Sequence, residues 1–149
     1  RNDKTKQKGM EQVPMIFLDS WIFLEYFLRE EKAKIAEKVI GDFVKTNGGL
    51  ISAAVLLEVK YRIAKKFGLE KAEETVITLE NIQNISILPV STGIAKFAAN
   101  LRIKYYSPER QLSFIDTINL ATAISAGCKK FYTGDKDFEG VEEIKVEII

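Results

Sequence analysis

The sequence predicts an α/β fold in which helices cover both faces of a central parallel sheet. Short apolar runs alternate with longer amphipathic segments along the chain. This alternation is typical of parallel strands that are joined by helical crossovers. The 149 residues suit one domain with a substantial core, and no repeat or Pro/Gly/Ser-rich linker divides them. We therefore expect a single domain over residues 13–149, preceded by a disordered tail over residues 1–12.

The first half of the chain is expected to contain a strand, a helical hairpin and one further helix. Their expected bounds are Met15–Leu18 for the strand, residues 21–45 for the hairpin and residues 53–67 for the helix. The charged segment Glu30–Lys34 separates the two helices of the hairpin, and Gly48 and Gly49 mark a turn after it. Ser52 is a candidate N-cap for the last of these helices, which Gly68 ends.

The second half continues the alternation of helices and strands. We expect helices over residues 69–82, 94–106 and 113–127, and strands over residues 86–90, 129–133 and 141–149. Pro108 stops the helix over residues 94–106. The next helix begins with Ser113 and Asp116 at the spacing of a capping box and ends at Gly127. Residues 133–138 are expected to form a loop.

The composition excludes several classes of enzyme. Histidine is absent and Cys128 is the single cysteine. These two facts exclude Ser-His-Asp and Cys-His hydrolases, zinc sites built from histidine or several cysteines, and an internal disulfide. Any hydrolytic chemistry must therefore rest on carboxylates. Because carboxylate oxygens suit hard cations, the metal of such an enzyme would be Mg²⁺ or Mn²⁺.

The charge of the chain is nearly balanced, with 22 basic and 21 acidic residues and a net charge of +1. Residues 1–9 carry four basic residues and one acidic residue, so the remainder carries 18 basic against 20 acidic ones. Contact with a nucleic acid would therefore depend on local basic patches. No apolar run is long enough to span a membrane and the first residues lack the apolar segment of a secretory signal, so we expect a cytoplasmic protein.

Four acidic residues lie where a ligand site is expected. In an open parallel sheet, ligands bind beyond the carboxyl ends of the strands, where the strand order reverses. Asp19 follows the first expected strand and Asp135 follows the strand over residues 129–133, so both meet in one crevice if those strands are neighbours. Glu58 lies inside one expected helix, and Asp116 lies in the first turn of another.

Each of the four acids also has a purely structural explanation. Glu58 lies one helical turn before Arg62, a spacing that suits an exposed ion pair. Asp116 could cap its own helix, Asp19 could cap the helix that follows it, and Asp135 could be a turn residue. Singly, none of the four indicates a site.

Their combination is more informative, because two of the acids are embedded in apolar sequence. Asp19 lies in MIFLDSWIFL and Asp116 lies in LSFIDTINLA, where unpaired charges are costly. Carboxylates that converge in a partly buried site repel one another and stay ionised only if a cation compensates them. Such a site supports hydrolysis of a phosphate ester, because the metal activates water, orients the phosphate and neutralises developing charge.

The motifs around these acids resemble those of PIN domains. FLDS at Asp19, SAAVLLEV at Glu58, FIDTINLATA at Asp116 and YTGDKDF at Asp135 follow the four-acid pattern of that family. The closing Thr-x-Asp-x-x-Phe and the Asp-x-x-x-x-Ala-x-Ala shape around Asp116 are the most specific parts. The resemblance extends from about residue 15 to the C-terminus and implies a three-layer α/β/α PIN-like fold with a central parallel sheet.

The resemblance also implies an activity and a set of site residues. It implies an Mg²⁺- or Mn²⁺-dependent endoribonuclease that tends to form a homodimer. The metal-binding and catalytic residues would be Asp19, Glu58, Asp116 and Asp135, with Ser20, Asn119, Thr133 and Asp137 in supporting positions. A short PIN domain is most similar to a VapC-type toxin of a toxin–antitoxin pair, whose partners would be RNA and an antitoxin protein.

Basic and aromatic residues in two helices are candidates for contact with RNA. They are Lys60, Arg62, Lys65 and Lys66 in one helix, and Arg102, Lys104, Tyr105, Tyr106 and Arg110 near the end of another. Their alternative explanation is an ordinary solvated face or packing at a helix end. The hairpin after Asp19 contains Trp21, Phe23, Phe27 and Leu28, which a small domain would leave partly exposed, and this also favours a dimer.

Other protein classes fit the sequence less well. A phosphatase of the haloacid-dehalogenase type needs a second Asp two positions after the first, where Trp21 stands. A receiver domain needs an acidic pair at the end of its first strand, where Leu18 and Ser20 flank Asp19. A non-catalytic PIN-like module that binds RNA or protein and a stand-alone RNA-processing nuclease stay open as alternatives, although intact acids at all four positions favour an enzyme.

Overall fold

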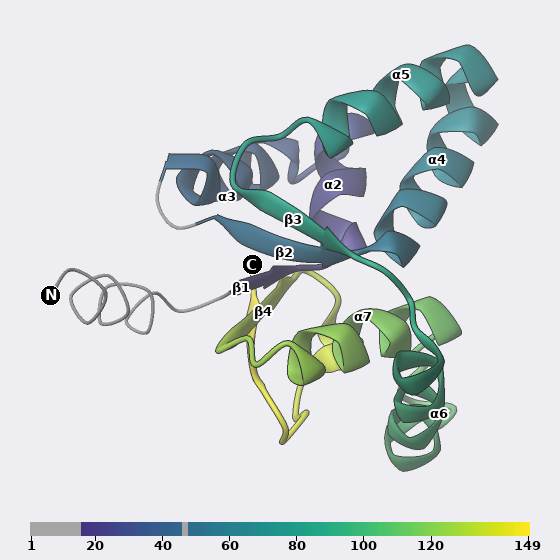
Figure 1. The fold of residues 1–149 in the computed structure, drawn as a ribbon. Coiled ribbons are helices and arrows are strands. Elements are labelled where there is room, and N and C mark those ends of the chain that lie inside the picture. Colours follow the sequence, from purple (N-terminus) through teal and green to yellow (C-terminus); the bar gives the residue numbers. More distant parts are fainter. Residues whose placement is uncertain (1–15, 46–47) are drawn as a thin grey trace, which may run out of the picture.

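A computed structural model describes residues 16–45 and 48–149 of the chain (Figure 1). The expected disordered tail over residues 1–12 lies outside the described residues, and so does Met15 at the start of the first expected strand. Within the described ranges, no helix is long and apolar enough to cross a membrane.

Five parallel strands form one sheet in the order β3-β2-β1-β4-β5. Their bounds are β1 Ile16–Leu18, β2 Gly49–Ser52, β3 Ile85–Leu88, β4 Lys130–Thr133 and β5 Lys145–Ile148. Phe17 of β1 aligns with Leu50 of β2 on one side and with Phe131 of β4 on the other. The chain therefore adds β2 and β3 on one side of β1 and later adds β4 and β5 on the other side. The strand order reverses at β1, which places the expected crevice at the carboxyl ends of β1 and β4.

The helices form a layer on each face of the sheet, which confirms the predicted three-layer α/β/α architecture (Figure 1). One layer consists of α2 Ser20–Phe27, α3 Ala33–Lys45, α4 Ala53–Phe67 and α5 Leu69–Glu80. The other consists of α6 Thr92–Tyr105 and α7 Phe114–Ser125. The predicted helical hairpin, the N-cap at Ser52 and the capping box at Ser113 are all present.

Each face of the sheet has its own apolar core, because successive strand residues point in opposite directions. Phe17 is fully buried against the α6 and α7 layer, where its ring stacks on Phe131 with the centroids 5.2 Å apart. Leu18, the next residue, is fully buried in the opposite core with Ile51. The two cores hold β1 in the centre of the molecule and so fix the position of the residue that follows it, Asp19.

Two expectations about strand ends were wrong. β3 ends at Leu88, before Pro89, because proline has no N–H to donate to a neighbouring strand. The last strand starts at Lys145, four residues after its expected start. Val141 and Ile144 are buried in the core without strand pairing, so their apolar character reflects packing. Within the expected loop at residues 133–138, a short 3-10 helix, η1, spans Lys136–Phe138.

The apolar residues of the α2 hairpin do not form an exposed face, contrary to the reasoning that favoured a dimer. Phe23 is fully buried and Leu28 is 4% exposed. Trp21 and Phe27 are half-buried and pack against the same core. The cause is the position of α2, which contacts α3 and α4 and is covered by them. These four residues therefore carry no argument about the oligomeric state.

Candidate functional site

The topology brings Asp19 and Asp135 to the same end of the sheet. Asp19 directly follows β1, and its backbone N–H donates to the carbonyl oxygen of Tyr132 in β4 at 3.0 Å. Asp135 lies two residues beyond the end of β4. Glu58 is carried by α4, which begins where β2 ends, and Asp116 is carried by α7, which contacts both β2 and α4.

Asp19 is 2% exposed, and both of its carboxylate oxygens accept hydrogen bonds. Asn119 Nδ2 donates to Oδ1 at 3.1 Å, and Thr133 Oγ1 donates to Oδ2 at 2.8 Å. The donors come from α7 and β4, two elements that both lie far from β1 in the sequence. The carboxylate is therefore fixed in orientation by two other elements of the fold, and it does not cap the helix that follows it.

Asn119 is fully buried and connects three other polar residues. Its Nδ2 donates to Ser20 Oγ at 3.1 Å as well as to Asp19, so both of its N–H groups are used. Its Oδ1 accepts from Ser52 Oγ at 2.7 Å. The predicted supporting residues Ser20 and Asn119 are thus joined to Asp19, and Ser52, which the sequence indicated only as a helix cap, is joined to them.

Ser52 performs two functions with one hydroxyl group. It accepts a hydrogen bond from the backbone N–H of Ala54 at 3.1 Å, which is the expected capping contact, and it donates to Asn119. The residue is fully buried. The capping signal in the sequence was correct, but nothing in the sequence indicated the second contact, because it joins residues 67 positions apart.

The closing motif Thr-x-Asp-x-x-Phe has a local explanation in the structure. The hydroxyl of Thr133 donates to Asp19 and also accepts from the backbone N–H of Asp135 at 3.0 Å. Asp135 Oδ1 in turn accepts from the backbone N–H of Asp137 at 2.9 Å. Phe138 is fully buried, with its ring centroid 4.8 Å from that of Phe131. The motif therefore anchors the loop after β4 and links Asp135 to Asp19 through a single hydroxyl group.

Gly134, inside this motif, lies directly under the Trp21 indole ring. A Cβ atom at this position would be 2.3 Å from Trp21 Cζ2, which is far inside contact distance. The ring of α2 and the backbone between Thr133 and Asp135 therefore pack in direct contact. No local pattern in the sequence indicates this contact, because the close approach of Trp21 and Gly134 depends on how α2 crosses the end of β4.

Burial raises the pKa of Asp19 to about 7 from an ordinary value of 3.8. Burial is the largest cause of this rise and the charges of Asp116 and Glu58 contribute to it, whereas the hydrogen bonds from Thr133 and Asn119 oppose it. An apolar environment and neighbouring negative charges both disfavour the ionised carboxylate. Asp19 is therefore the most strongly perturbed acid of the group.

The other three acids respond to one another in the same way. Burial is the largest cause that raises the pKa of Glu58. The charges of Asp116 and Asp135 also raise it. Burial raises the pKa of Asp116, and the charges of Asp135 and Asp137 add to this rise. Burial, followed by the charge of Asp137, raises the pKa of Asp135. The structure thus brings the four predicted acids into one electrostatic group.

The structural explanations of these acids hold in part. Asp116 caps α7, since its Oδ2 accepts from the Ser113 backbone N–H at 2.8 Å. Asp135 caps η1, since its side chain accepts from the backbone N–H of Asp137. The charge of Arg62 lowers the pKa of Glu58, but within residues 16–45 and 48–149 the two side chains form no ion pair. Capping therefore accounts for two of the four acids, and pairing with Arg62 does not account for Glu58.

The donor set suits a hard cation, although the carboxylates do not surround one. Among the described residues, no three acidic side chains lie close enough together to hold an ion. Asp116 and Asp135 each direct one oxygen to a capping N–H, which holds these carboxylates against their own helices. None of the four acids forms an ion pair with Lys or Arg in the described part of the chain. Clustered carboxylates without a basic partner are the donors that Mg²⁺ and Mn²⁺ prefer.

Most of the basic residues predicted to contact RNA are engaged elsewhere. Lys60 pairs with Glu73 at 3.1 Å, Lys66 with Glu30 at 3.8 Å, and Lys104 with Glu142 and Glu143 at 3.4 and 3.5 Å. Arg110 donates to the carbonyl oxygens of Asp137 and Glu139, and the ring of Tyr105 lies under it. Arg62 and Lys65 are exposed. Arg102 stacks on the rings of Tyr106 and Phe114.

Comparison with known proteins agrees with this geometry. The family model described as PIN domain matches residues 16–144. No sequence among the curated proteins matches the chain. Similar solved structures include VapC20 of Mycobacterium tuberculosis, a toxin that cleaves the sarcin-ricin loop, with 20% identity, a TM-score of 0.71 and coverage of 87% of this chain and 98% of that chain.

Two further structures show the same fold. VapBC2 of Rickettsia felis, bound to a DNA fragment from its promoter, has 16% identity, a TM-score of 0.70 and coverage of 89% and 97% of the two chains. A toxin–antitoxin complex of Klebsiella pneumoniae has 23% identity, a TM-score of 0.60 and coverage of 89% and 95%. At these identities the likeness extends to the fold, and it spans nearly the whole of each chain.

Proposed function

The chain belongs to the PIN-domain family, and we propose that it is a metal-dependent endoribonuclease that hydrolyses phosphodiester bonds in RNA. The observation that carries this proposal is the electrostatic group formed by Asp19, Glu58, Asp116 and Asp135. Their charges raise the pKa of members of the group, and in the described ranges none of the four forms an ion pair with Lys or Arg, although the charge of Arg62 lowers the pKa of Glu58. A buried charge of purely structural origin would be expected to have such a partner, and Asp19 is buried without one in the described ranges.

The four carboxylates would hold Mg²⁺ or Mn²⁺, and the bound cation supplies an activated water and neutralises charge on the phosphate. The residues around them orient the acids. Asn119 and Thr133 hold the two oxygens of Asp19, and Ser20 and Ser52 hold Asn119. Hydrogen-bonded partners of this kind fix metal-binding groups before a ligand arrives.

Asp135 is oriented by backbone groups, in contrast to Asp19. The N–H of Asp137 donates to Asp135 Oδ1, while Oδ2 has no hydrogen-bond partner in the described ranges. Asp116 likewise uses Oδ2 for its capping contact and keeps Oδ1 without one. Each of these acids therefore retains one oxygen for a cation.

We extend the proposal to a toxin that is paired with an antitoxin. Structures with this fold are described as a toxin that cleaves the sarcin-ricin loop and as toxin–antitoxin complexes, and these descriptions support RNA as substrate and an antitoxin as partner. A cytoplasmic location, a homodimer and a single domain that starts at residue 13 belong to the same proposal. A stand-alone RNA-processing nuclease would use the same site, and toxicity on expression that a neighbouring gene relieves would separate the two.

Metal titration tests the enzymatic part of the proposal directly. We expect calorimetry to detect Mn²⁺ binding to the purified chain, and we expect cleavage of single-stranded RNA that EDTA abolishes and Mn²⁺ or Mg²⁺ restores. Asp19→Asn should lose both properties. Glu80→Gln, which removes an exposed acid from the end of α5, should keep both. A chain that ignores Mn²⁺ would be a binding module, and cleavage in excess EDTA would refute the metal mechanism.

A further inference from the structure

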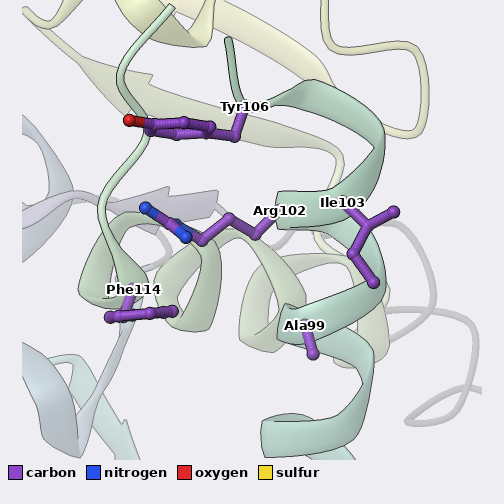
Figure 2. Close-up of a pocket in the computed structure, with 5 residues that line it drawn as sticks. All are labelled: Ala99, Arg102, Ile103, Tyr106 and Phe114. Carbon is purple, nitrogen blue, oxygen red and sulfur yellow. The ribbon is translucent and has the colours of Figure 1, made fainter. Parts of the chain in front are cut away.

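Arg102 lies between two aromatic rings at the surface, one of which belongs to the first residue of α7. Its guanidinium carbon is 4.3 Å from the centroid of the Tyr106 ring and 4.2 Å from that of the Phe114 ring. Figure 2 shows the three groups as a column, with the guanidinium group between the rings. Stacking of this kind on both faces of a guanidinium group is favourable and restricts its movement. We refer to Tyr106, Arg102 and Phe114 as the arginine stack.

The side chain of Arg102 is also fixed along its length. Its Nε donates to the carbonyl oxygen of Leu112 at 3.1 Å. In the part of the chain that the structure describes, its two terminal NH₂ groups have no hydrogen-bond partner, and no carboxylate pairs with it. The terminal nitrogens point away from α6 (Figure 2). The planar fork that binds phosphate in a bidentate way is therefore held in place and left unused.

The rings of the stack are open to solvent on their outer sides. Phe114 is 70% exposed and Tyr106 is 46% exposed, although aromatic side chains of this size are usually buried. Together with Ala99 and Ile103, the stack lines a surface hollow of about 310 Å³. Exposed aromatic faces next to a cation are the combination that single-stranded nucleic acids require, since bases stack on the rings and phosphates bind the cation.

The arginine stack and the acidic group share the first turn of α7. Phe114 opens α7, and Asp116 lies two residues later in the same first turn. The four acids would repel an RNA backbone, so a cation near them is needed to hold the phosphates on either side of the bond that is cut. Lys60, Lys66 and Lys104 already pair with acids. Arg102 has no such partner in the described ranges, and it stacks on Phe114, which shares the first turn of α7 with Asp116.

We propose that the arginine stack is a binding subsite for one unpaired nucleotide of single-stranded RNA, with its phosphate on the terminal NH₂ groups of Arg102 and its base on the outer face of Phe114. The proposal rests on the proposed function, because RNA is the substrate in both. Charge complementarity favours RNA as the occupant, because an unpaired cation between exposed rings is suited to an anionic, aromatic ligand.

Binding of a fluorescein-labelled single-stranded oligoadenylate to the full chain in EDTA tests this subsite without cleavage. We expect Phe114→Leu and Arg102→Gln each to lower the affinity by about tenfold or more, because each removes a stacking surface or a phosphate contact. Arg102→Gln should also reduce the slope of log affinity against log salt by about 0.7, the contribution of one phosphate contact to a single strand. Lys96→Gln removes an exposed charge from the same helix and should change the affinity less than twofold.

A second comparison separates RNA binding from self-association. Ile103 lines the same hollow and is 82% exposed, but it has neither a charge nor an aromatic face. Ile103→Ser should therefore retain the affinity for the oligonucleotide if the stack binds RNA. If Ile103→Ser lowers that affinity as much as Phe114→Leu, and both variants dissociate a dimer in sedimentation velocity, the hollow is an interface between copies and the subsite proposal is wrong.

The remaining outcomes are also decisive. A wild-type chain that does not bind the oligonucleotide, or equal losses in Arg102→Gln and Lys96→Gln, would overturn the subsite. Circular dichroism checks that the variants fold, which the high exposure of Phe114 and Ile103 leads us to expect. A chain that binds the oligonucleotide through the stack but shows no metal-dependent cleavage would overturn the proposed function and leave the subsite in place.

Discussion

Asp19→Asn should make the metal-free protein more stable, and the gain should grow with pH. Asp19 is buried, and its pKa rises to about 7 from an ordinary value of 3.8. The folded chain therefore holds this proton more tightly than the unfolded chain. Between these two pH values the folded state binds more protons, so ionisation of Asp19 lowers the free energy of unfolding as pH rises.

The size of the effect follows from the two pKa values. The difference between about 7 and 3.8 corresponds to roughly 4 kcal/mol, which is absent well below pH 4 and complete above pH 7. From about pH 5 to about pH 8 the same relation gives a loss of about 2.5 kcal/mol in the wild-type chain. Asparagine does not ionise, so the variant should not show this loss.

The asparagine side chain can keep both hydrogen bonds of Asp19. Its carbonyl oxygen can accept from Asn119 Nδ2, and its NH₂ group can donate to the Thr133 hydroxyl, which rotates to accept. The substitution therefore removes the buried charge and keeps both contacts, although the Thr133 hydroxyl hydrogen loses its acceptor. This is why a gain in stability is expected here instead of the loss that most buried substitutions cause.

Urea unfolding at a series of pH values measures the effect, with the fluorescence of Trp21, the only tryptophan, as the probe. The difference in unfolding free energy between Asp19→Asn and wild type should rise by about 2.5 kcal/mol from about pH 5 to about pH 8. Glu80→Gln, at an exposed position, should track the wild type. Mn²⁺ should stabilise the wild type at about pH 8 and not the variant. A difference that stays flat with pH would refute the reasoning.

Three further substitutions test the site at other positions. Glu58→Gln should lower Mn²⁺ affinity and cleavage together, whereas Arg62→Ala should spare Mn²⁺ affinity in calorimetry; equal effects of the two would favour a simple ion pair. Gly134→Ala should cost about 1 to 3 kcal/mol in thermal unfolding, because its Cβ meets the Trp21 ring, while Gly41→Ala, with open space around it, should not destabilise. Ser52→Ala should lower the free energy of unfolding by about 2 kcal/mol, since it loses a helix cap and a buried hydrogen bond to Asn119. Ser91→Ala loses a cap alone and should lower it by about 1 kcal/mol. Equal losses would show that the bond to Asn119 adds nothing.

The sequence predicted the elements of the fold well where the signal is local. The capping box of Ser113 and Asp116 and the N-cap at Ser52 were correct, because a cap depends only on residues within one turn. The last strand was predicted too long, because apolar residues such as Val141 and Ile144 are buried for reasons of packing that look like strand alternation. Periodicity reports burial, and burial has more than one cause.

The candidate site was predicted as a set of residues, but their arrangement was not. Apolar surroundings in the sequence correctly indicated that Asp19 is buried. The same reasoning applied to the hairpin after it suggested an exposed apolar face, which was wrong, because α3 and α4 cover Phe23 and Leu28. A sequence shows that a segment is apolar but does not show which neighbours cover it.

The sequence by itself determined the family and the order of strands and helices, and it predicted the four acids with their supporting residues Ser20, Asn119, Thr133 and Asp137. Only the tertiary structure decided that Ser52 holds Asn119, that Trp21 packs on Gly134, and that Arg102 lies between two rings. The hydrogen bonds of Asp19 join residues 100 and 114 positions apart. Contacts at such separations form only when the chain returns to β1, and no local pattern specifies them.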